Sequence, residues 1–100
     1  MNTNNSVITL NTKFNFGQVV ATATLVRYCE EKNYSLLPYL IRHGNCDWGD
    51  VCAEDKESND SALKEDLRIL SSYKLPDGNA IWIITEADRS STTVLFPSDY

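Results

Sequence analysis

Hydrophobic positions are densest in the last third of the chain, where they follow the two-residue period of β-strands. Residues 80–86 are apolar on both faces, which is typical of a central strand. Residues 67–74 and 92–96 are the other β-rich stretches, and Pro-Asp-Gly within 75–79 predicts the turn that joins the first two strands. We therefore predict a three-stranded antiparallel meander over residues 67–97.

Helical patterns lie upstream of this meander. Thr22 is a suitable N-cap for a helix over residues 23–32, and Gly44 is expected to stop a second helix over residues 36–43. A third helix, at about residues 51–66, is almost wholly polar and is expected either to lie on the surface or to be partly irregular. These segments predict an α+β fold in which two or three helices pack against one face of the sheet.

The chain divides into a short N-terminal arm and one domain. Residues 1–13 are rich in Asn and Thr, and their alternating patch at residues 7–10 fits either a flexible arm or an edge strand. Residues 14–100 are expected to form a single α+β domain, beginning with an extended segment at residues 14–20. Trp48 lies in a loop rich in Gly and Asx residues, where we expect it to plug the loop onto the core.

The composition is that of a soluble globular protein with an acidic balance. With 9 basic and 14 acidic residues the net charge is −5, which argues against general binding to a nucleic-acid backbone. No apolar run approaches the roughly 20 residues of a membrane span, and the N-terminus lacks the basic start of a signal peptide. We therefore expect a cytoplasmic protein without a membrane partner. Three cysteines, an odd number, favour reduced thiols.

A set of motifs makes the chain similar to a known group of sequences. The motifs are Arg42-His43, Asp47-Trp48-Gly49-Asp50, Glu54-Asp55-Lys56, Asn59, Ala62-Leu63-Lys64, Trp82 to Ser90, Thr92-Thr93-Val94-Leu95 and Tyr100. Through them the chain, from about residue 14 onward, resembles a family of small bacterial proteins described as plasmid-related or hypothetical. Some members of this family carry the label of a type I restriction-modification subunit.

The resemblance implies a genetic context, that of a cargo gene on a mobile element, and no particular activity. A restriction methyltransferase subunit needs a cofactor-binding fold far larger than this chain, and no glycine-rich cofactor loop is present. The chain departs from the family in its long N-terminus and at Ala23-Thr24, where the family pattern is expected to have Pro-Gly.

Side chains of ligand and nucleophile type surround the only histidine, His43. Cys46, Asp47 and Cys52 follow it closely, but their spacing matches no usual zinc pattern. We therefore expect no metal and no cofactor. A dyad of His43 with Cys46 is a second alternative, although a histidine that ends a helix is more often a satisfied C-terminal residue. A small hydrolase-like enzyme using His43 with Asp47 or Asp50 is a third.

The tip between the last two predicted strands carries charges of both signs. Glu86, Asp88 and Arg89 either form a carboxylate–guanidinium pair that fixes the turn, or face a partner. Because residues 88–91 contain enough side-chain acceptors to build the turn, we favour the structural role over contact with a partner.

The acidic excess is concentrated in one segment. Residues 46–66 hold eight acids and two lysines, a charge of −6 that leaves +1 for the rest of the chain. A solvated face is the ordinary explanation, and an anionic docking surface for a basic partner is the functional one. The acids are Asp47, Asp50, Glu54, Asp55, Glu57, Asp60, Glu65 and Asp66.

These observations predict a non-enzymatic protein-interaction module carried by mobile elements, which binds a basic host or defence protein through its acidic helix. Besides the hydrolase-like enzyme, an oligomeric structural protein that uses a sheet edge is an alternative. The candidate binding residues are Trp48, Asp50, Glu54, Asp55, Glu57, Glu86, Asp88 and Arg89.

Overall fold

The computed structural model of the protein describes residues 11–100, and the alternating patch at residues 7–10 lies outside them. The described chain combines helices with a four-stranded sheet, which confirms the α+β class. Among these residues, every helix falls short of the length and apolarity that a membrane crossing requires. The elements are β1 (Gln18–Ala21), α1 (Ala23–Lys32), α2 (Leu37–Gly44), α3 (Ala53–Glu65), β2 (Ile69–Lys74), β3 (Ala80–Thr85), β4 (Ser91–Leu95) and the 3-10 turn η1 (Pro97–Asp99).

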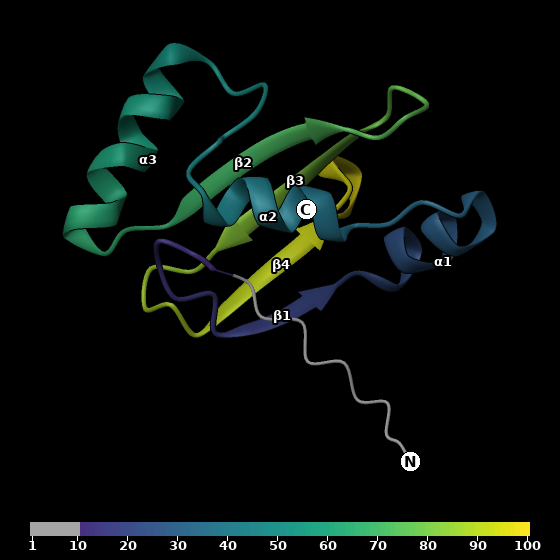
Figure 1. Cartoon of the computed structure of the whole chain (residues 1–100), viewed down its shortest axis with the longest axis horizontal. Helices are drawn as coiled ribbons and strands as arrows, with labels where there is room; N and C mark the ends of the chain where they lie inside the picture. Colours follow the sequence, from purple (N-terminus) through teal and green to yellow (C-terminus); the bar gives the residue numbers. More distant parts are fainter. Residues whose placement is uncertain (1–10) are drawn as a thin grey trace.

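The sheet has the strand order β1-β4-β3-β2 (Figure 1). Strands β2, β3 and β4 form the predicted antiparallel meander, and β3 is paired on both sides, as its two apolar faces predict. The predicted number of strands is wrong, because β1 adds to the sheet parallel to β4, with Gln18 opposite Ser91 and Ala21 opposite Val94. The extended conformation of this segment follows from its own residues, but its partner lies about 70 residues away along the chain.

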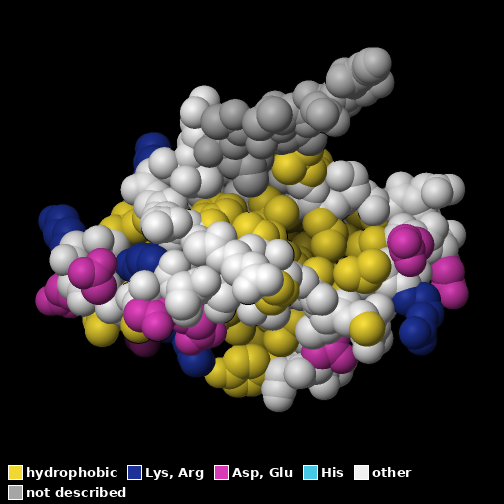
Figure 2. All heavy atoms as spheres, turned by 90° about the horizontal axis from the view of Figure 1, so that it is seen from below, with side chains coloured by type: hydrophobic (Ala, Val, Ile, Leu, Met, Phe, Trp, Pro, Cys, Tyr) yellow, Lys and Arg dark blue, Asp and Glu magenta, His cyan; other side chains and the backbone are white. Residues whose placement is uncertain are grey.

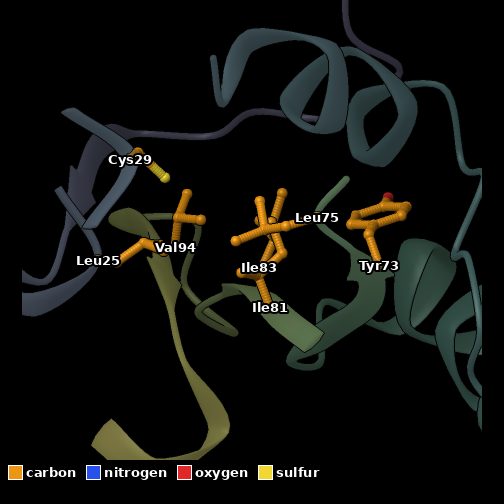
Figure 3. Close-up of a cluster of buried hydrophobic side chains, with 7 residues drawn as sticks. All are labelled: Leu25, Cys29, Tyr73, Leu75, Ile81, Ile83 and Val94. Carbon is orange, nitrogen blue, oxygen red and sulfur yellow. The ribbon is translucent and has the colours of Figure 1, made fainter. Parts of the chain in front are cut away.

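The main core lies between the sheet and the helices on one of its faces. Figure 3 shows Leu25 and Cys29 of α1 beside Val94 of β4, with Tyr73 of β2 at the other end of the cluster. The strand residues come from alternate positions, because successive side chains of a strand point to opposite faces. The cluster consists of Leu25, Cys29, Tyr73, Leu75, Ile81, Ile83 and Val94.

A second cluster closes the side of the sheet next to α3. Trp48 is 4% exposed and packs with Ala62 of α3 and Ile69 of β2, and Phe14 lies against them. Its Nε1 donates a hydrogen bond to the Asp60 carboxylate at 3.1 Å. The predicted plug is confirmed. Because its indole is buried, Trp48 does not belong to the candidate binding surface.

The predicted helix bounds are correct to within two residues, but the predicted role of Gly44 is not. Thr22 accepts a hydrogen bond from the Leu25 amide at 3.4 Å as the N-cap of α1, and Asn33 ends that helix in the left-handed conformation. Gly44 is the last residue of α2 and does not stop it. A Cβ at this position would lie 2.6 Å from Thr12 Cγ2, so the glycine allows the close approach of the N-terminal segment, and a larger residue would displace the Thr12 side chain.

Candidate functional site

The outer side of α3 is the main candidate surface. The helix contacts the domain through Asn59 and Ala62, which are 4% and 1% exposed. Glu54, Asp55 and Glu57, all predicted binding residues, are exposed. Glu54 and Asp55 also occupy the first helical turn, where negative charge is favoured by the helix dipole.

Asn59 fixes the position of α3 on the sheet. Its Nδ2 donates to the Leu70 carbonyl at 2.8 Å, and its Oδ1 accepts from the Leu70 amide at 3.1 Å. The carboxamide thereby replaces a neighbouring strand for one residue at the edge of β2. Sequence reasoning missed this role because Asn59 stands within an uninterrupted polar run, residues 54–61.

A shallow groove of about 310 Å³ lies beside α3. Leu67, which is 50% exposed, forms its apolar wall. Two carboxylates next to an exposed leucine suit a side chain with an apolar stem and a cationic head. The helix wall of this α3 groove consists of residues spaced along one helical face, Glu54, Glu57, Ser58 and Ser61.

The acids of α3 have no ion-pair partner in the described part of the chain. The ion pairs within residues 11–100 join Arg42 to Asp47 at 2.7 Å and Arg68 to Glu86 at 3.2 Å. Asp50, in the loop before α3, is exposed and adds to the acidic surface, while its amide donates to the Ser72 carbonyl at 2.7 Å. The carboxylates of the groove are therefore not neutralised by an ion pair within residues 11–100.

Arg89 holds the tip of the β3–β4 hairpin against the end of α3. Its Nη1 donates to the Leu67 carbonyl at 2.7 Å and to the Glu86 carbonyl at 3.1 Å. Its Nη2 donates to the Ala62 carbonyl at 2.9 Å, near the C-terminus of α3, where a cation is favoured. The predicted pairing of Arg89 with a neighbouring carboxylate is wrong, because main-chain carbonyls occupy the guanidinium.

The two acids of the tip are also engaged within the chain. The Glu86 carboxylate accepts from Arg68, which donates to the Tyr100 hydroxyl at 2.7 Å through its other terminal nitrogen. The Asp88 carboxylate accepts from the Ser90 amide at 2.9 Å, and hydrogen bonds from the Ser90 side chain and amide lower the pKa of Asp88. The turn-building role is confirmed for Asp88.

His43 lies at the centre of a buried polar chain. The residue is 0% exposed, with Nδ1 2.5 Å from Ser71 Oγ and Nε2 2.9 Å from Thr85 Oγ1. Thr85 Oγ1 lies 2.8 Å from Thr92 Oγ1, which donates to the Phe16 carbonyl at 2.8 Å. Helix α2, three strands and the N-terminal segment are thus tied together by one hydrogen-bonded chain.

The carbonyl at the end of this chain sets the direction of every hydrogen in it. Because the Phe16 carbonyl only accepts, the hydroxyl hydrogen of Thr92 is used there, and Thr85 must donate to Thr92. Nε2–H of His43 then donates to Thr85, and Nδ1 accepts from Ser71. The chain thus fixes a hydrogen on Nε2, and in the neutral imidazole this is the only ring N–H.

Aromatic rings enclose this imidazole. The ring centroids of Phe14, Phe16 and Trp48 lie 5.3, 5.5 and 5.8 Å from that of His43. Desolvation by burial lowers the pKa of His43 to about 3, so the imidazole is neutral at pH 7. The imidazole belongs to the core and has no surface at which it meets a substrate.

The other residues considered for catalysis or metal binding are not gathered at His43. The Asp47 carboxylate accepts from Arg42 at 2.7 Å, and this hydrogen bond lowers the pKa of Asp47. Within residues 11–100, no group of three or more His, Cys, Asp and Glu side chains is arranged to hold a metal ion. The predicted reduced state agrees with three free thiols, Cys29, Cys46 and Cys52.

Comparisons of the chain with protein-family models, with curated proteins and with solved structures gave no match. The resemblance to plasmid-related proteins and the cytoplasmic location therefore stay predictions. What the protein does has to be inferred from its own surfaces, of which the α3 groove combines charge, shape and an apolar wall.

Proposed function

We propose that the protein is a non-enzymatic interaction module, carried by mobile elements, that binds a basic protein partner through the α3 groove. The observation that supports this most strongly is the groove itself, in which Glu54 and Glu57 lie beside the exposed Leu67. A lysine or arginine of the partner would lay its apolar stem on Leu67 and place its cationic head between the carboxylates.

Charge beyond the groove supports the same class of partner. The segment 46–66 carries −6 while the rest of the chain carries +1, so the acidic excess of the chain is concentrated in α3 and the residues that flank it. Such a concentration of negative charge accelerates encounter with a basic surface and disfavours an acidic one. Host or defence proteins that ordinarily bind DNA present basic surfaces, and occupation by α3 would exclude nucleic acid from them.

The rigid attachment of α3 also favours binding. Asn59 and Arg89 fix the middle and the end of the helix, so little ordering is needed when a partner docks. A hydrolase-like enzyme based on His43 has no comparable support, because the imidazole is buried and Asp47 is bound to Arg42.

The test compares two double variants that remove the same charge at different places. Glu54→Gln with Glu57→Gln removes both carboxylates of the groove, and Glu30→Gln with Glu31→Gln removes two exposed carboxylates of α1. A partner captured from a bacterial lysate at about 0.05 M salt should be released at about 0.5 M salt. We expect the groove variant to bind this partner about tenfold more weakly than the α1 variant.

Isothermal titration with the captured partner gives these affinities. Equal affinity of both double variants would contradict the groove as the docking site. Binding of a partner that is not basic, or binding that salt does not weaken, would contradict the proposed partner class.

A further inference from the structure

The two edges of the sheet differ in how their main-chain groups are satisfied. At the β2 edge, Asn59 pairs with both main-chain groups of Leu70. Next along the strand, the Ser72 amide donates to the Trp48 carbonyl at 3.1 Å, and the Ser72 carbonyl accepts from Asp50 at 2.7 Å. This edge is therefore covered by the protein's own loop and helix, which prevents further strand pairing.

The β1 edge has no such cover in residues 11–100. The Gln18 amide donates to the carbonyl of Ser90, just before β4, at 3.0 Å, and the Thr22 amide donates to the Val94 carbonyl of β4 at 3.1 Å. Because main-chain groups alternate in direction along a strand, the amides and carbonyls of Val19 and Ala21 point away from β4. The described sheet has no strand on that side. Val19 and Val20 are 43% and 38% exposed.

The β1 segment itself carries no charge, and the Asp99 carboxylate, which accepts from the Thr22 hydroxyl at 2.9 Å, lies just beyond its end. No charged residue occurs from Phe14 to Val26, a stretch centred on Val20, although the chain carries −5 overall. Figure 2 views the molecule from the side on which β1 lies, and hydrophobic side chains fill much of the middle of that view, while most charged groups lie along its sides and lower rim. The acidic helix α3 is at the opposite edge of the sheet, beside β2 (Figure 1).

We propose that β1 pairs in antiparallel fashion with β1 of a second copy, so that the two four-stranded sheets become one sheet of eight strands. The two sheets join with the same face on the same side when the twofold axis is perpendicular to the sheet and lies between one residue of β1 and the same residue of the second copy. With Val20 as that residue, Val19 lies opposite Ala21 of the second copy. Both of these residues have outward main-chain groups. Each such pair exchanges two hydrogen bonds, which gives four across the interface.

A second copy fits this edge better than a charged partner does. The strand Gln18–Ala21 offers only apolar and amide side chains, so two copies meet there without bringing like charges together. The two acidic helices then lie at the far ends of the joint sheet, where their mutual repulsion is smallest and is screened by salt. The dimer leaves both α3 grooves open and does not depend on the proposed function.

The first test measures mass in solution as a function of concentration. Light scattering on the full chain should give a mass that rises from 11.3 kDa toward twice that value as the concentration increases. Val20→Lys places two ammonium groups opposite each other on the axis and should raise the dimer dissociation constant by at least about tenfold. Val26→Lys is the matched control, since Val26 is 40% exposed but lies on α1, and it should leave the constant unchanged.

A cross-link then tests the register. Opposed residues that do not exchange hydrogen bonds have Cα atoms about 4.5 Å apart, within the range of a disulfide. In a Cys52→Ser background, which removes the exposed native thiol, Val20→Cys should form a disulfide dimer at least about tenfold faster than Val26→Cys. A mass that stays at 11.3 kDa, or equal rates for both cysteines, would overturn the proposal. This holds also if the negative result arises because another segment or another protein occupies the β1 edge.

Discussion

The neutral imidazole of His43 makes the stability of this domain depend on pH. In the folded chain the pKa of His43 is about 3, whereas a histidine in an unfolded chain has a pKa of about 6.5. Between these values the unfolded chain binds a proton that the folded chain does not. The free energy of unfolding therefore keeps its full His43 contribution above about pH 6.5 and loses it as the pH falls toward about 3.

We expect the free energy of unfolding to be about 2 kcal/mol lower at about pH 5 than at about pH 7. His43 is the only histidine, so few other side chains change charge in this interval. Urea unfolding at the two pH values measures the difference. His43→Gln cannot titrate, so it should be less stable at both pH values and lose the difference. An undiminished difference in this variant would assign the effect to another group.

Interactions between residues that are close in the sequence can be predicted from it, and interactions between distant residues cannot. The cap at Thr22 depends only on neighbouring residues, so its prediction succeeds. His43 meets Ser71 and Thr85, which lie 28 and 42 residues further along the chain. No spacing along the sequence brings these side chains together, and the histidine therefore resembled an ordinary helix-terminal residue.

At the scale of elements, α3 is a polar helix that side chains attach to main-chain groups. Its apolar contacts are few, with Ala62 the main buried apolar residue of the helix. Asn59 bonds to the edge of β2, and Arg89 reaches from the β3–β4 hairpin to the helix end. Such contacts compensate for the small apolar area that this helix buries. The sequence predicts a polar surface helix here. The contacts that hold α3 to β2 and to the β3–β4 hairpin could not be predicted, because they depend on the tertiary fold.

Arg89→Lys should destabilise the domain by about 2 kcal/mol, because one ammonium cannot reach the carbonyls of Ala62, Leu67 and Glu86 together. Arg68→Lys is the matched control. The Arg68 pair with Glu86 is half exposed, so its substitution should cost less than about 1 kcal/mol. Urea unfolding of both variants decides the point, and equal losses would mean that the anchor role of Arg89 is wrong.

Asn59→Asp keeps the acceptor for the Leu70 amide but places a carboxylate against the Leu70 carbonyl. We expect a loss of about 2 kcal/mol, since a buried acceptor pair replaces a hydrogen bond. Asn45→Asp is the control, because Asn45 also donates to a carbonyl, that of Ile41, but is exposed. Amide hydrogen exchange should show faster exchange in α3 for Asn59→Asp alone, and unchanged exchange there would contradict the attachment.

At the scale of the whole molecule, charge and apolar surface are separated across the sheet. The acidic helix covers the β2 edge, while the uncharged strand β1 forms the other edge. The meander could be predicted because hairpin turns join its strands, and its β-branched residues are dense. The position of β1 could not, because parallel pairing leaves no turn between the partners and the strand has only four residues.

The pairing of β1 with β4 also sets the order in which the protein can be completed during synthesis. Gln18 and Ser91 are opposite each other, yet Gln18 is synthesised long before Ser91. On the ribosome, α1 and α2 emerge long before β4, so their core face has no complete sheet to cover until β4 has left the exit tunnel. The sheet therefore closes only after β4 has emerged, and until then the valine-rich first strand lacks the partner with which it pairs.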